Sequence, residues 1–122
     1  MTDMFAMFQG ASAFNQDIVT WDTSQVTQLS GMFNGATAFN QNIGAWHTSN
    51  VTDMISMSEG ATAFNRGIGT WDVSNVSDTG GVFSQTSSFN QNLGVWDTSS
   101  VTNMRTMFFC ANAFNGTIEY VR

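Results

Sequence analysis

Hydrophobic and polar residues alternate along this chain in a pattern that repeats every 25 residues without an insertion or deletion. The repeat defines five units in one predicted domain, 1–122, with boundaries at 1–25, 26–50, 51–75, 76–100 and a truncated 101–122. A unit this short cannot bury its own apolar face, so adjacent units must stack and share a core. The most regular positions form three ladders: Trp21, Trp46, Trp71 and Trp96; Phe14, Phe39, Phe64, Phe89 and Phe114; and Asn15, Asn40, Asn65, Asn90 and Asn115.

Within a unit, the apolar spacing predicts a short helix followed by a short strand. Ser24 is a plausible helix cap and Gly35 a plausible stop signal, and Ile43 to Thr48 alternates apolar and small residues as a strand does. Gly80 and Gly81 would each cost such a helix about 1 kcal/mol. The helical stripe comprises Val26, Leu29, Met32, Phe33 and Ala36.

Stacked units of this kind predict an α/β repeat solenoid of the leucine-rich-repeat type, with a parallel strand and a helix or helical turn in each unit. A β-helix with three short faces is the competing arrangement, and the helical stripe favours the first. In either arrangement we expect the phenylalanine and tryptophan ladders to point into the core. We expect the asparagine side chains to hydrogen-bond to backbone groups in the bends.

Composition excludes several classes of partner. Nine acidic residues against three arginines give a formal charge of −6, so phosphate-rich nucleic acid and anionic membrane surfaces are poor partners. No apolar run is long enough to span a membrane, and no signal peptide or anchor is recognisable in this chain. Cys110 is the only cysteine, which excludes an internal disulfide, and it replaces a glycine of other units.

The motif M-F-x-G-A-x-x-F-N-Q-x-I-x-x-W-D-T-S-x-V-T-x-M, read from Met32 to Met54, resembles a known repeat. It is similar to the repeat of bacterial surface proteins and mycoplasma-type lipoproteins grouped with the BspA-like leucine-rich repeats. The resemblance covers essentially the whole chain. It implies a solenoid that is displayed on the cell surface or secreted, and that contacts host or matrix proteins.

One face of the expected strands is the candidate binding surface, because it would expose carboxylates, hydroxyls and one imidazole. Stacked carboxylates about 5 Å apart could bind calcium, but each unit supplies only one, so a capping role is favoured and no metal or cofactor is predicted. Regular threonine rows, including Thr2, Thr27, Thr52 and Thr102, make a carbohydrate- or ice-binding face a remote alternative. The candidate residues are Asp22, Thr23, His47, Thr48, Asp72, Asp97 and Thr98.

Catalysis is not expected, because His47 has no nucleophile at a motif-like spacing and the acidic residues are scattered. The sequence therefore predicts a non-enzymatic module that binds an unknown protein or surface ligand. The alternative is a purely structural scaffold. Because neither end of the repeat array has a distinct capping unit, we also expect self-association through the solenoid ends.

Overall fold

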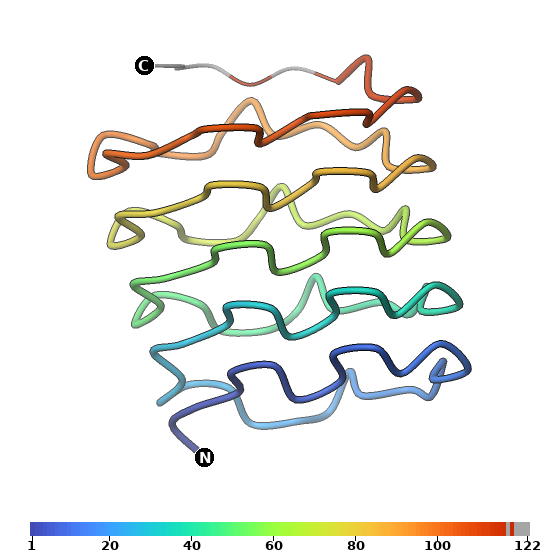
Figure 1. Ribbon diagram of the computed structural model, residues 1–122. Coiled ribbons are helices and arrows are strands. Elements are labelled where there is room, and N and C mark those ends of the chain that lie inside the picture. The colour runs from blue at the N-terminus through green and yellow to red at the C-terminus, as the bar shows by residue number, and fades with distance from the viewer. Residues whose placement is uncertain (117, 119–122) are drawn as a thin grey trace.

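The chain winds into flat coils that stack on one another, one coil for each 25-residue unit (Figure 1). The computed structural model describes residues 1–116 and residue 118, so most of the end of the last unit lies outside the described residues. The first and last units lie at opposite ends of the stack. Neighbouring coils are joined by isolated parallel bridges, Asp3 to Gln28, Gln28 to Asp53, Asp53 to Asp78, Asp78 to Asn103 and Leu93 to Ile118.

Two alternating kinds of backbone hydrogen bond organise the first part of each coil. Every second N–H donates to a carbonyl of the next coil. The N–H groups between them donate within their own coil: the first to a side-chain oxygen two residues back, as Ser30 does to Gln28 at 2.8 Å, and the others to a carbonyl three residues back, as Met32 does to Leu29 at 3.2 Å. This part of each coil is therefore a run of tight turns. Its N–H groups donate to the next coil, and in an internal coil its carbonyls accept from the preceding one. Four bonds of 2.8 to 3.0 Å join the second coil to the third: Leu29 to Asp53, Gly31 to Ile55, Phe33 to Met57 and Gly35 to Glu59.

The helix expected in each unit is absent, and that prediction was wrong. No residue in 1–116 is helical, and the backbone of the turn run takes positive φ at Gly31 (64°) and Gly35 (75°), which a right-handed helix does not allow. Consecutive turns bring the same apolar residues inward that a helix would, and Leu29, Met32 and Phe33 are all at most 1% exposed. The i, i+3, i+4 spacing therefore arose from turns.

The expected strand was wrong as well. Residues 44 and 45 form a turn, closed by the Trp46 N–H donating to the Ile43 carbonyl at 3.1 Å, and the described residues contain no strand longer than an isolated bridge. Most bridges lie in the segment that was expected to be helical. The α/β leucine-rich-repeat solenoid is thus excluded. The competing β-helix would need three parallel sheets, and the described residues form only isolated bridges.

The φ angles also correct the expected cost of Gly81. Gly81 has φ of 66°, at the position where other units place Ala6, Ser56 and Thr106 in the same left-handed conformation. Glycine adopts this conformation without the steric cost that a side chain brings. Gly81 therefore suits its position.

Stacked aromatic rings form the centre of the core. Phe39, Phe64 and Phe89 are at most 1% exposed, and the rings of the phenylalanine ladder are 5.7 to 6.0 Å apart with interplanar angles of 4 to 12°. Trp46 and Trp71 stack at 6.4 Å, and each indole N–H donates to a carbonyl of the preceding coil at 3.0 to 3.1 Å. The end rings Phe14 and Phe114 are only partly buried, because each has a neighbour on one side.

The asparagine ladder runs along the outer edge of the stack. The side-chain oxygen of Asn15 accepts the backbone N–H of Asn40 at 2.9 Å, and Asn40 accepts that of Asn65 at 3.0 Å. The pattern continues to Asn90 and Asn115. Each side chain thus replaces a backbone carbonyl where the chain bends, so the side-chain ladder fixes the register of neighbouring coils.

Candidate binding surface

The candidate carboxylates lie in one exposed row at a corner of the coils. Asp22, His47, Asp72 and Asp97 all face solvent, one in each of four successive coils. The carboxylate of Asp22 accepts hydrogen bonds from the Ser24 hydroxyl at 2.7 Å and from the Ser24 N–H at 3.0 Å. This closes a local side-chain turn of the kind that Asp forms with a residue two positions later.

The same turn holds the other carboxylates of the row. The Ser74 hydroxyl and N–H donate to Asp72 at 2.6 and 3.0 Å, and the Ser99 N–H donates to Asp97 at 3.0 Å. Hydrogen bonds favour the charged form of a carboxyl group. The side-chain hydrogen bonds of Ser24, Ser74 and Ser99, followed by their backbone N–H bonds, accordingly lower the pKa of Asp22, Asp72 and Asp97 below the ordinary 3.8.

The candidate threonines do not belong to this surface. Thr23, Thr48 and Thr98 are 2%, 3% and 1% exposed. The hydroxyls of Thr23 and Thr48 donate to the carbonyls of His47 and Asp72 in the next coil, each at 3.0 Å. The expectation that these residues face solvent was wrong, because alternating residues at a coil corner point in opposite directions and these point inward.

A different hydroxyl row is exposed. Thr2, Thr27, Thr52, Ser77 and Thr102 face solvent on five successive coils. The hydroxyls of Thr27, Thr52, Ser77 and Thr102 also donate to the preceding coil, as Thr52 does to the Thr27 carbonyl at 3.3 Å. The sequence identified this row as regular, but the 25-residue interval alone does not distinguish an outward row from an inward one.

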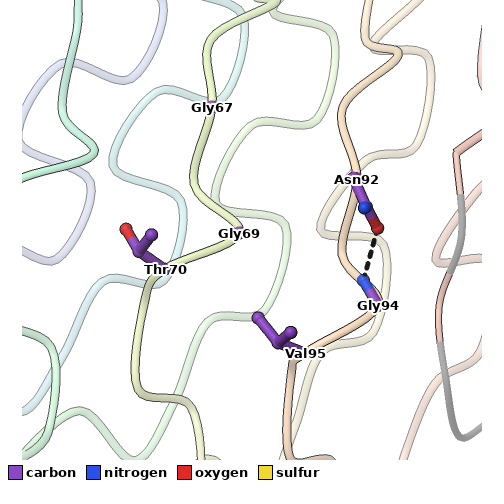
Figure 2. A pocket seen from close by; sticks show the side chains of 6 residues that line it. All are labelled: Gly67, Gly69, Thr70, Asn92, Gly94 and Val95. Carbon is purple, nitrogen blue, oxygen red and sulfur yellow. Dashed lines mark hydrogen bonds between the residues drawn. The ribbon is translucent and has the colours of Figure 1, made fainter.

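A shallow hollow opens between the third and fourth coils. It measures about 290 Å³ and is lined by Gly67, Gly69, Thr70, Asn92, Gly94 and Val95 (Figure 2). Small-molecule sites usually measure about 300–1,000 Å³ and carry convergent polar groups. Here the side-chain oxygen of Asn92 already accepts the Gly94 N–H at 2.7 Å, and the Thr70 hydroxyl donates to the Gly44 carbonyl at 3.2 Å.

The hollow has a local cause in the sequence. Asp17, Asn42 and Asn92 hydrogen-bond to the N–H two residues later, whereas the equivalent residue of the third coil is Gly67, which has no side chain. The hollow therefore marks a missing turn side chain, and nothing in its lining supplies acid–base or nucleophilic chemistry.

Residues 1–116 and 118 offer no metal-binding cluster and no membrane-spanning helix. No cluster of three or more metal-ligating side chains occurs among them. None of their segments forms an apolar helix of the length that crosses a bilayer. Cys110 is exposed in the last described coil.

The regular coils, the shared ladders and the exposed polar rows define a tandem-repeat protein. The family model described as "Mycoplasma protein of unknown function, DUF285" matches residues 1–79 and again residues 41–121. The chain belongs to this family. No curated protein and no solved structure matches it. The leucine-rich-repeat part of the resemblance is not supported, because the described part of the chain contains neither its helix nor its strand.

Proposed function

We propose that this protein is a non-enzymatic display module that binds a protein or another surface ligand through the outside of its coils. The observation that carries the proposal is the row of Asp22, Asp72 and Asp97, in which each carboxylate is exposed and is already oriented by a local turn. Side chains that are ordered before binding lose less conformational entropy when a partner arrives. Ladders of hydrogen bonds between coils hold the row itself in register.

The row favours a partner that carries hydrogen-bond donors or positive charge. The three carboxylates are charged at neutral pH, since the ordinary pKa of 3.8 is far below 7 and the hydrogen bonds of their serine neighbours lower the pKa of each further. Their charge, together with the −6 of the whole chain, would steer a basic partner surface toward this corner. The resemblance to bacterial surface repeats supports a location at the cell surface or outside the cell, where such partners include matrix proteins.

Surface plasmon resonance over immobilised collagen and fibronectin tests the proposal. The test variant carries Asp22→Asn, Asp72→Asn and Asp97→Asn, which keep the turn geometry and remove three negative charges. The matched control carries Asp3→Asn, Asp53→Asn and Asp78→Asn, which remove the same charge at another set of side-chain turns. We expect wild type and control to bind one of the two matrix proteins, and the test variant to bind at least about 10-fold more weakly.

Two results would contradict the display function. One is no binding of the wild-type chain to either matrix protein. The other is equal weakening in the two triple variants, which would indicate a response to net charge alone and not to the corner row.

A further inference from the structure

The hollow between the third and fourth coils contains a backbone N–H that lacks its usual acceptor. In the first, second and fourth coils, the N–H of Val19, Gly44 and Gly94 donates to the side-chain oxygen of the residue two positions earlier, at 2.7 to 2.9 Å. Gly67 stands at that earlier position in the third coil and offers no such oxygen. None of the described residues accepts from the N–H of Gly69, which is the equivalent donor.

The backbone of the third coil keeps the turn that the missing side chain would close. The Trp71 N–H donates to the Ile68 carbonyl at 3.1 Å, and the equivalent residues of the second coil do so at the same distance. A Cβ added to Gly67 would have its nearest contact at 3.9 Å, so the space beside this backbone is open. The Gly69 N–H therefore faces the volume that an aspartate or asparagine side chain fills in the other coils.

The opposite wall of the hollow adds a second donor and an apolar contact. The side-chain oxygen of Asn92 accepts the Gly94 N–H, but nothing in the described part of the chain accepts from its amide nitrogen, Nδ2. Val95 is 81% exposed, and its side chain points from the fourth coil toward the third (Figure 2). The two free donors, Gly69 N–H and Asn92 Nδ2, both belong to residues that line the hollow, and neither is charged.

We propose that the hollow binds the carboxamide group of a small ligand, in the place that the side chains of Asp17, Asn42 and Asn92 occupy in their own coils. The carbonyl oxygen of the ligand has two lone pairs and accepts from the Gly69 N–H and from Nδ2 of Asn92. The carbon attached to that carbonyl packs against Val95. A carboxamide is favoured over a carboxylate, because both donors are neutral and the chain carries a charge of −6.

Two sources of this group fit the hollow: the N-acetyl group of an amino sugar and the side-chain amide of free asparagine. The volume of about 290 Å³ lies at the lower end of the range for small-molecule sites. The hollow therefore takes the amide group and leaves most of a larger ligand outside. This site does not use the carboxylate row of the display function, so each can fail without the other.

Titration with acetamide, followed by nuclear magnetic resonance, tests the site. We expect the amide proton of Gly69 to shift downfield and to saturate in the millimolar range, because so small a ligand makes few contacts. The N–H groups of Gly44 and Gly94 are internal controls and should shift little, since they already have acceptors. Ethylammonium, which is of similar size and carries only donors, should not shift Gly69. Acetate should bind more weakly than acetamide at equal ionic strength, and tighter binding of acetate would overturn the choice of a carboxamide.

Gly67→Asn fills the site from within the chain. Its side-chain oxygen satisfies the Gly69 N–H as Asn42 satisfies that of Gly44, so the response to acetamide should be lost while the fold is kept. Thr62→Asn is the matched control, because it adds the same side chain at an exposed position of the same coil outside the hollow. No shift of Gly69 in wild type, or a shift that persists in Gly67→Asn, would overturn the proposal.

The double variant Asn42→Gly, Gly67→Asn should move the site by one coil. The second and third coils approach each other as the third and fourth do, since a Cβ added to Gly44 would overlap the carbonyl of residue 67, as one added to Gly69 would overlap that of Asn92. We expect acetamide to shift the Gly44 amide proton in this variant and to leave Gly69 unchanged. A folded double variant in which neither glycine responds would contradict the pairing of the two donors.

Two pairs of probes then identify the source of the amide. N-acetylglucosamine is compared with glucose, and asparagine is compared with alanine. A Gly69 shift with only one of the two amide probes assigns the site to that source. Equal shifts with an amide probe and with its partner that lacks the amide would overturn the carboxamide assignment.

Discussion

Replacing Gln85 by glycine should stabilise the protein, although it removes a large side chain. Gln85 has φ of 57°, in the left-handed region, where the equivalent residues of the first three units are Gly10, Gly35 and Gly60. A side chain in this region costs about 1–2 kcal/mol. Glycine removes this cost, but it also gives the unfolded chain more conformational entropy, which lowers the stability of the folded state by about 0.4–1 kcal/mol. Gln85 is exposed and its side chain makes no hydrogen bond to the described residues, so the substitution loses no side-chain hydrogen bond.

The difference between the two effects should raise the free energy of unfolding by about 0.5 to 1 kcal/mol. For a domain of this size, that corresponds to an increase in Tm of about 2 to 5 °C. Thermal denaturation followed by near-ultraviolet circular dichroism measures it. Gly60→Ala is the reverse experiment, because φ is 71° there and an added Cβ would meet its nearest atoms at an ordinary 3.7 to 3.8 Å. We expect Gly60→Ala to lower Tm, because the substitution changes only the backbone cost.

Gly67→Ala provides the control of opposite sign. Gly67 does not have a positive φ, and an added Cβ would lie 3.9 Å from the nearest atom, Oε1 of Gln91. Alanine at that position should be neutral or stabilising by up to about 1 kcal/mol. A lower Tm for Gln85→Gly, or the same change for Gly60→Ala and Gly67→Ala, would refute the assignment of left-handed turns.

Three further outcomes follow from the contacts. Phe64→Ala should lower the free energy of unfolding, measured by urea denaturation, by about 3–5 kcal/mol, because it removes a ring stacked between Phe39 and Phe89. His47→Ala should change stability little, and equal effects of the two substitutions would contradict the assignment of Phe64 as inward and His47 as outward. Gly69→Ala should lower Tm, whereas Gly67→Ala should not, because the Cβ added at residue 69 would overlap the carbonyl oxygen of Asn92; a silent Gly69→Ala would count against this close approach of coils. The pKa of Asp22, Asp72 and Asp97 in the folded protein lies below 3.8, so these carboxylates stabilise the fold above pH 3.8 and lose this effect as the pH falls below that value. The triple Asn variant should therefore lose less stability than wild type on acidification, and an identical dependence of stability on pH would contradict the serine hydrogen bonds.

The sequence predicted the repeat and its inward ladders but not the backbone that builds them. A period of 25 residues requires residues such as Phe39 and Phe64 to line up in adjacent units, whatever secondary structure connects them. The helix was wrong because two successive turns place Leu29, Met32 and Phe33 on the inside as a helical stripe would. The signal that could have distinguished them was Gly31 together with Gly35, two glycines four residues apart within a supposed helix.

Of the candidate surface, the sequence predicted the exposed carboxylates but not the direction of the threonines beside them. Asp22 and Ser24 carry the pattern of a local side-chain turn, and such short-range hydrogen bonding can be read from sequence. The direction of Thr23 cannot, because it depends on the φ and ψ of its neighbours at the corner. The 25-residue recurrence of a polar residue favours a surface row, but Thr23 and Thr48 are buried and their hydroxyls donate to backbone carbonyls of the next coil.

Hydrogen-bond scalar couplings measured by nuclear magnetic resonance would test the coil stack most directly. In the third coil, the N–H of Ser56 donates to the carbonyl of Gly80 at 2.8 Å, and that of Gly60 donates to Ser84 at 2.9 Å. We expect couplings across both of these bonds, between residues 24 positions apart in the sequence. A coupling from the N–H of Ser58 to the carbonyl of Met54, four residues earlier, would instead indicate an α-helix and contradict the stacked turns.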